Sequence, residues 1–143
     1  MKMQVAWFHR FGEPEEMVLE ETQSPIPGPG EALVRVRATG VNHVDLDVRA
    51  GTARVPIQFP HILGRGFAGE VAALGSAGGA FKEGDRVWVA SRLACGQCEF
   101  CWTGRDNLCE RGHFFGMGLP GGYAQYVKVP VVSLRALQPQ MGF

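Results

Sequence analysis

The sequence has no long hydrophobic run, no net charge and no cysteine outside one short stretch. Its 143 residues contain no run of about 18 apolar residues, the length that a membrane-spanning helix needs, so we expect no membrane partner. The formal net charge of +0 argues against nucleic acid as a partner. Residues 1–17 lack the apolar segment of a signal peptide, and we therefore expect a cytoplasmic, reducing location.

Short strand-like segments dominate what is present. Apolar residues make up 45% of the chain and charged residues 20%, which is ordinary for one globular domain with a core. The segments that favour strands are residues 4–8, 32–38, 86–90 and 123–129. Glycine and proline separate these segments, which predicts a mainly β fold, either a small barrel or a sandwich. One short helix is expected at residues 44–50, where Gly51 ends it.

All four cysteines lie in CGQCEFCWTGRDNLC, and they are Cys95, Cys98, Cys101 and Cys109. Their separations of two, two and seven residues allow four thiolates to reach one tetrahedral zinc ion. Disulfide bonds or free buried thiols are the alternatives, but the spacing and the missing export signal favour zinc. A catalytic zinc keeps one position open for water or substrate, so a site with four protein ligands is expected to be structural.

Several motifs together resemble a known family. They are PIPGPGEALVRVRATGVNHVDLDVRAG (residues 25–51), FPHILGRGFAGEVAALG (59–75), FKEGDRV (81–87), the cysteine stretch, and GGYAQYV (121–127). On these motifs the chain resembles the N-terminal, GroES-like domain of the medium-chain dehydrogenase/reductase superfamily, which includes zinc alcohol dehydrogenases and quinone oxidoreductases. The resemblance implies that residues 1–143 form a partly open GroES-like β-barrel, with short helices and a zinc-binding lobe at about residues 92–113.

The resemblance also distinguishes two zinc sites. It implies that the four cysteines hold one structural Zn²⁺ ion, whereas the ligands of a catalytic zinc are not retained. Asn42 stands where zinc alcohol dehydrogenases have a cysteine, and Arg65 with Gly66 replaces the His-Glu of their Gly-His-Glu motif. A guanidinium has no lone pair for a metal and repels a dication. The motif GVN-x-VD is similar instead to zinc-independent quinone oxidoreductases, although Arg65 and Gly66 fit neither branch.

Three residues near the expected cleft are candidates for function because of this resemblance. Asn42 is the candidate catalytic residue, as a hydrogen-bond donor to a developing oxyanion. His43 is a candidate cofactor-binding residue that faces a phosphate, or else an ordinary surface histidine. Arg65 is expected to offer positive charge to an anionic substrate or to a cofactor phosphate. Asp45 has either a role in the cleft or a helical ion pair with Arg49, four residues later.

One further motif is misleading. GRGFAG, residues 64–69, matches the G-x-G-x-x-G fingerprint of dinucleotide-binding sites, and Asp85 follows at a suitable distance. That fingerprint requires a buried strand before it and a helix after it. Here Pro60 interrupts the preceding segment, and the following GEVAALG is short and has glycine at both ends. We therefore expect a tight strand connection at the cleft.

The resemblance implies a two-domain, NAD(P)H-dependent oxidoreductase that reduces a carbonyl or an activated double bond of a small-molecule substrate. A Rossmann domain, which binds the NAD(P)H, is expected beyond residue 143, and residues 1–143 alone are expected to be inactive. The sequence does not decide whether a full-length enzyme forms homo-oligomers. The alternatives are a stand-alone zinc-stabilised binding module and a zinc-dependent alcohol dehydrogenase with an atypical site.

Overall fold

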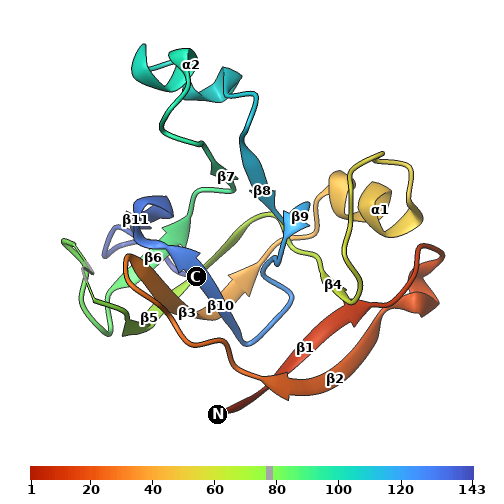
Figure 1. Cartoon of the computed structure of the whole chain (residues 1–143). Helices are drawn as coiled ribbons and strands as arrows, with labels where there is room; N and C mark the ends of the chain where they lie inside the picture. Colours follow the sequence, from red (N-terminus) through yellow and green to blue (C-terminus); the bar gives the residue numbers. More distant parts are fainter. Residues whose placement is uncertain (77–78) are drawn as a thin grey trace.

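The computed structural model describes residues 1–76 and 79–143, and its strands form three sheets (Figure 1). The largest sheet has the order β10-β3-β5-β6-β11, and it contains β3 (Glu31–Thr39), β5 (Phe67–Leu74), β6 (Arg86–Val89), β10 (Tyr126–Pro130) and β11 (Leu134–Ala136). The second sheet, β2-β1-β4, contains β1 (Lys2–Phe8), β2 (Val18–Gln23) and β4 (His61–Ile62). The third sheet, β7-β8-β9, contains β7 (Arg92–Leu93), β8 (His113–Phe115) and β9 (Gly118–Leu119). The first two sheets are purely antiparallel.

Helical segments in the described residues are short. They are α1 (His43–Ala50), α2 (Glu99–Trp102) and the 3-10 turns Pro14–Glu16, Asp106–Leu108 and Val131–Ser133. The helix expected at residues 44–50 is confirmed as α1, and Gly51 ends it with a φ of 81°, in the left-handed region that glycine adopts readily. The mainly β architecture with short helices is likewise confirmed.

Alternation along β3 explains how the main core forms. Ala32 and Val34 are fully buried, whereas Arg35 and Arg37 on the opposite face are exposed. The same alternation buries apolar side chains from the other strands of the sheet, and the main core is Ala32, Val34, Phe67, Val71, Val87, Val89, Phe115, Val127, Val129 and Leu134. A smaller core under α1 packs Phe8 against Val48 and Leu63. This smaller core fixes α1 against β1 and the segment after β4.

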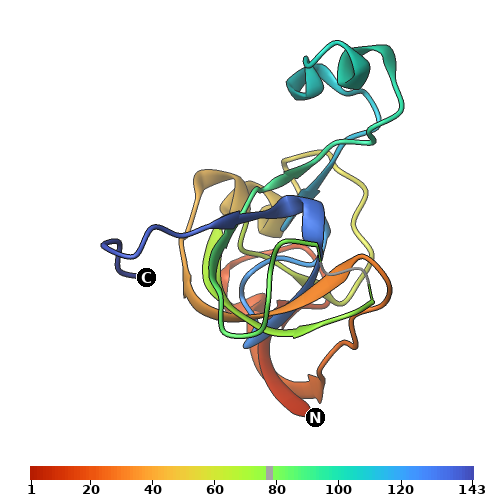
Figure 2. The same ribbon diagram turned by 90° about the vertical axis from the view of Figure 1, so that its left-hand side faces the viewer.

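Residues 92–113, which we call the cysteine lobe, project away from the barrel as a hairpin-like extension. Both ribbon views show α2 at the far end of this projection (Figures 1 and 2). The base of the lobe is the pairing of β7 with β8, in which Arg92 lies opposite Phe114 and Leu93 opposite His113. The main core contains Phe115 but no residue of the lobe itself. The lobe therefore depends on its base and on its own internal contacts.

The strand expected at residues 123–129 begins three residues later than its pattern suggests. β10 starts at Tyr126, because residues 123–125 bond mainly to β1, although the Val36 N–H of β3 still donates to the Gln125 carbonyl at 2.9 Å. The Ala6 N–H donates to the Tyr123 carbonyl at 2.8 Å, and the Gln125 N–H donates to the Gln4 carbonyl at 3.0 Å. This crossing joins the two large sheets, and an alternating pattern does not reveal it.

The segment GRGFAG does not have the structure of a dinucleotide-binding turn. Phe67 begins the eight-residue strand β5, so a strand and not a helix follows the two glycines at positions 64 and 66. The expected strand connection is confirmed. Within residues 1–76 and 79–143, no helix is long and apolar enough to cross a membrane.

Candidate functional site

The four cysteines meet in the outer part of the cysteine lobe. Their Sγ atoms all lie within 4.8 Å of one another. The sulfurs of Cys98 and Cys101 are 3.5 Å apart, and those of Cys95 and Cys101 are 3.9 Å apart. A disulfide would need about 2.0 Å, whereas thiolates at about 2.3 Å from a tetrahedral zinc lie about 3.8 Å from one another. The donor set and its geometry therefore fit one tetrahedral zinc ion.

Backbone N–H groups help to position two of these sulfurs. The Gln97 N–H donates to Cys95 Sγ at 3.4 Å and lowers the pKa of that thiol to about 6, while burial raises the pKa of the Cys101 thiol to about 11. The Cys95 N–H donates to Cys109 Sγ at 3.4 Å. Zinc binds thiolates, so an ion that is held by these sulfurs would displace the remaining thiol protons.

Two loops lie beside each other at the end of β3, and they contain the positions that the resemblance assigned to a cleft. The backbone N–H of Gly40 and the Thr39 hydroxyl both donate to the Gly66 carbonyl at 3.1 Å. A side chain at Gly66 would begin 3.9 Å from Asn42 Nδ2. The structure therefore brings Asn42 next to the Arg65-Gly66 segment.

The Asp45 side chain connects these two loops by hydrogen bonds to the backbone of each. Only 2% of its surface is exposed. One carboxylate oxygen accepts the Gly64 N–H at 3.0 Å, and the other accepts the Asn42 N–H at 2.8 Å. The alternative of an ion pair with Arg49 is wrong, because the Arg49 Nε donates to the Gly12 carbonyl at 3.1 Å. The Asp45 carboxylate instead fixes the backbone of both loops.

The three candidate residues differ in their surroundings. Asn42 is exposed at the start of α1, where it precedes the first helical residue. His43 is 87% exposed and lies 3.7 Å from Asp47, one turn later. Arg65 is half-buried, and its guanidinium carbon lies 4.4 Å from the centroid of the Phe114 ring. Asn42 and Arg65 thus belong to neighbouring loops, but the Arg65 guanidinium is directed to the base of the cysteine lobe.

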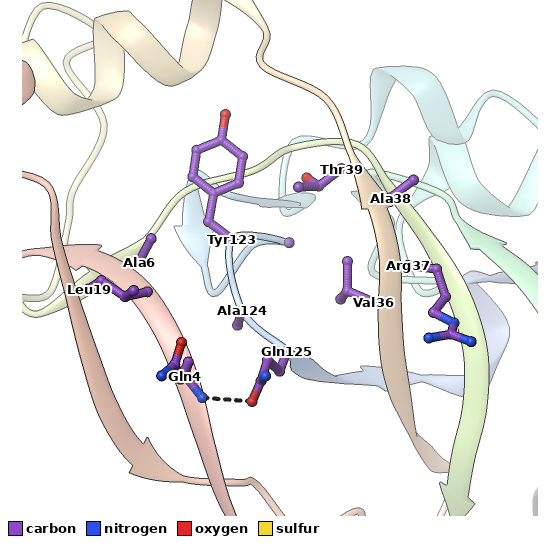
Figure 3. A pocket seen from close by; sticks show the side chains of 11 residues that line it. Gln4, Ala6, Leu19, Val36, Arg37, Ala38, Thr39, Tyr123, Ala124 and Gln125 are labelled. Atoms are coloured by element: carbon purple, nitrogen blue, oxygen red, sulfur yellow. Dashed lines mark hydrogen bonds between the residues drawn. The ribbon is translucent and has the colours of Figure 1, made fainter.

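A hollow of about 420 Å³ opens between the two large sheets (Figure 3). Figure 3 shows Gln4, Ala6 and Leu19 on one side and the end of β3 on the other, with Tyr123 and Thr39 near one end. A second hollow of about 360 Å³ shares Ala38 and Thr39 with it and reaches Gly66. Both hollows therefore border the end of β3, and the second also borders Gly66.

Tyr123 is the residue of this region that sequence reasoning missed. Its hydroxyl lies 3.4 Å from the Gly40 carbonyl and 3.5 Å from an Asp45 oxygen, so it bridges the loop to the carboxylate. Burial, and then the neighbouring Asp45 charge, raises the pKa of Tyr123 to about 12. Tyr123 therefore keeps its proton at neutral pH and acts as a donor. Its only sequence signal was its position directly after two glycines.

Comparison with known proteins decides the family. Residues 28–139 match the model of the alcohol dehydrogenase GroES-like domain. The chain belongs to this family. In keeping with that assignment, it is 37% identical over 133 residues to an NAD-dependent alcohol dehydrogenase of Sulfolobus acidocaldarius and 42% identical over 127 residues to an alcohol dehydrogenase of Rhizobium meliloti. These alignments cover 90% and 88% of this chain, but 38% and 37% of the relatives.

Solved structures of alcohol dehydrogenases have the same GroES-like fold. One NAD-dependent alcohol dehydrogenase superposes with a TM-score of 0.95 at 37% identity, covering 99% of this chain and 41% of that chain. A cobalt- and zinc-bound alcohol dehydrogenase from Pyrobaculum aerophilum superposes with a TM-score of 0.91 at 39% identity, covering 98% of this chain and 43% of that chain. The chain thus spans about two-fifths of the length of these relatives. The expectation of a GroES-like barrel is confirmed.

Proposed function

We propose that residues 1–143 are the substrate-binding domain of an NAD(P)H-dependent oxidoreductase that works without a catalytic zinc. The enzyme reduces a carbonyl or an activated double bond of a small molecule, and a Rossmann domain beyond residue 143 binds the cofactor. Relatives named as dehydrogenases, of which the chain spans about two-fifths, support this division of the protein. In the same proposal the enzyme is cytoplasmic, and the full-length protein is able to form a homo-oligomer.

The observation that supports it most directly is the donor set at the cleft. Asn42 lies beside the Arg65-Gly66 segment, and these residues offer one amide, one guanidinium and no side chain that zinc prefers. A metal ion can be shared by three or more Cys, His, Asp or Glu side chains that lie close together. Among the described residues, the four cysteines form such a group, and no such group lies at the cleft. The cleft therefore depends on hydrogen bonds for the stabilisation that a zinc ion would otherwise supply.

The zinc that fits the cysteine lobe has a structural role in this proposal. Cys95, Cys98, Cys101 and Cys109 fill all four positions of a tetrahedron, which leaves none for water or substrate. The ion holds together a lobe that has little core of its own. It takes no part in the reaction.

Asn42 is the proposed catalytic donor. It is exposed at the cleft, and the backbone of its loop is held by Asp45. When the substrate carbonyl receives a hydride, negative charge develops on the oxygen, and a positioned amide N–H lowers the energy of that charge. The cofactor supplies the hydride when bound. His43, one residue later and 87% exposed, is proposed to face a cofactor phosphate.

The test is a steady-state assay of the gene product that includes the downstream cofactor domain. With NADH or NADPH and panels of enones, quinones and aldehydes, Asn42→Ala is expected to lower kcat about 100-fold, the usual cost of one lost oxyanion donor. Asp47→Asn is the matched control on the same helix and is expected to leave kcat unchanged. An unchanged kcat in Asn42→Ala would remove Asn42 from the mechanism. Turnover that requires added zinc would favour the zinc-dependent alternative.

A further inference from the structure

Arg65 differs from the other half-buried arginines in the described part of the chain. Those others are Arg49, Arg86 and Arg92, and each donates to a backbone carbonyl at 2.6 to 3.3 Å. Among residues 1–76 and 79–143, the Arg65 guanidinium donates no hydrogen bond to an oxygen and has no carboxylate within 4.0 Å. Its one polar contact runs from Nη1 to the Met117 sulfur at 3.6 Å, and thioether sulfur is a weak acceptor. The guanidinium therefore has strong donors that the protein leaves free.

The guanidinium is nevertheless held in one place. Its carbon lies 4.4 Å from the centroid of the Phe114 ring, a distance at which a cation is attracted to an aromatic face. The backbone beneath it is fixed as well, because Gly64 donates to the buried Asp45 carboxylate at 3.0 Å. An arginine that is oriented in advance loses less freedom when it binds a planar anion. Arg65 therefore has the features of a prepared anion-binding group.

Phe114 is itself fixed by the base of the cysteine lobe. The Arg92 guanidinium carbon lies 5.0 Å from the centroid of the same ring, and Arg92 Nη2 donates to the Cys109 carbonyl at 2.6 Å. A metal ligand of the lobe is thus connected through Arg92 and Phe114 to Arg65. This connection makes Phe114 a positioning residue for the Arg65 guanidinium.

We infer that Arg65, on the loop beside Asn42, binds an oxyanion, a carboxylate or a phosphate next to the Phe114 ring, at the base of the cysteine lobe. This inference rests on the proposed function for the source of the anion: either the substrate carries a carboxylate near its reducible group, or the cofactor presents a phosphate. Both sources share the same chemistry, because each offers two oxygens to the parallel N–H donors of a guanidinium. Arg65 thereby selects for a ligand that carries negative charge.

The direct test is an NMR titration of the zinc-loaded 143-residue protein, observing arginine Nε–Hε signals with acetate and with inorganic phosphate. The Arg65 signal is expected to shift and saturate, whereas the exposed Arg54 signal shifts only weakly. Phe114→Leu, a change that removes the ring and keeps an apolar side chain, is expected to weaken the response about fivefold or more. An Arg65 signal that moves no more than that of Arg54 would overturn the inference.

Steady-state kinetics of the gene product that includes the cofactor domain distinguish a substrate carboxylate from a cofactor phosphate as the source of the anion. If the substrate supplies the anion, Arg65→Gln raises the KM of a 2-oxo acid about tenfold and leaves that of its methyl ester unchanged. If the cofactor supplies it, the variant raises the KM of NADPH or NADH instead. Arg65→Lys keeps the charge without the planar guanidinium, so its KM is expected to lie between those of the wild type and of Arg65→Gln. Unchanged KM values throughout would contradict the inference, whereas a complete lack of turnover would refute the proposed function and leave the titration to decide on Arg65.

Discussion

The buried Asp45 carboxylate accepts the backbone N–H of Gly64 at 3.0 Å, and so it joins the start of α1 to the opposite loop of the cleft. Hydrogen bonds to a charged acceptor contribute about 1.5–3 kcal/mol each. Asp45→Ala leaves the buried Gly64 N–H and the partly buried Asn42 N–H without this partner, so we expect it to lower the free energy of unfolding by about 3–5 kcal/mol. Urea denaturation measures this loss.

Asp47→Asn is the control for that substitution, because Asp47 is on the same helix but its side chain is 42% exposed, and its contacts are the Thr52 hydroxyl at 3.2 Å and His43 at 3.7 Å. Its expected effect is within about 0.5 kcal/mol. Equal effects of the two substitutions would show that Asp45 does not hold the cleft together.

Gly64 has its own constraint, which a pair of glycine substitutions can expose. Its φ is 99°, and a Cβ there would lie 2.8 Å from the Gly122 nitrogen and 2.9 Å from the Tyr123 nitrogen. Gly84 also has a positive φ, of 86°, but a Cβ there meets nothing within 4 Å. We expect Gly84→Ala to cost about 1–2 kcal/mol from backbone strain alone. Gly64→Ala should cost at least about 2 kcal/mol more, since the backbone must also move. Thermal unfolding of both variants tests this difference, and equal losses would contradict the close approach of residues 122–123 to Gly64.

Much of the barrel could be predicted from local pattern. The alternation of β3 and the helix end at Gly51 are encoded within a few residues, and both were correct. The late start of β10 could not be predicted, because residues 123–125 are drawn to β1, which lies more than 100 positions away in the chain. Strand patterns report which face is apolar but not which strand becomes the neighbour.

The candidate site divides in the same way. The cysteine spacing predicted a cluster, and the structure assembles it within 4.8 Å. For Asp45 the sequence predicted a role in the cleft as one of two alternatives, but it did not predict the partner. That partner is the backbone N–H of Gly64, which does not depend on the residue type. Tyr123 and Phe114 were missed for a related reason: each acts through a contact with a distant loop.

His61 makes the stability of the fold dependent on pH. It is 4% exposed, Nε2 lies 3.2 Å from the Gly116 carbonyl, and burial lowers the pKa of its imidazole. The folded protein therefore prefers the neutral ring, while the unfolded chain takes up a proton near pH 6.5. The contribution of His61 is present above about pH 6.5 and is lost as the pH falls toward its lower folded pKa.

Urea unfolding of the wild type and of His61→Asn at pH 7.5 and pH 5.0 measures this contribution. We expect the difference between the two pH values to be smaller in His61→Asn, whereas His9→Asn, at a 52% exposed side chain, leaves it unchanged. If the stability difference between pH 7.5 and pH 5.0 were larger in His61→Asn than in the wild type, His61 would be charged in the folded state.

Loss of the metal is expected to unfold the cysteine lobe and leave the barrel intact. Cys95→Ser removes one of the four sulfurs, and the main core contains no residue of the lobe. Hydrogen exchange should become fast for amides between about residues 94 and 112 but stay slow in β3 and β5. Glu110→Gln, an exposed position next to Cys109, serves as the control. Fast exchange across β3 and β5 in Cys95→Ser would mean that the barrel cannot fold without the lobe.

The most direct test of a cleft that works without zinc is the zinc content of the purified protein, measured by mass spectrometry under native conditions in the wild type and in Cys95→Ser. We predict about one zinc per chain in the wild type and none in the variant, because the four cysteines hold the ion and Asn42, Arg65 and Gly66 hold no other. About two zinc ions in the wild type, with one retained in Cys95→Ser, would contradict this prediction and place a metal at the cleft.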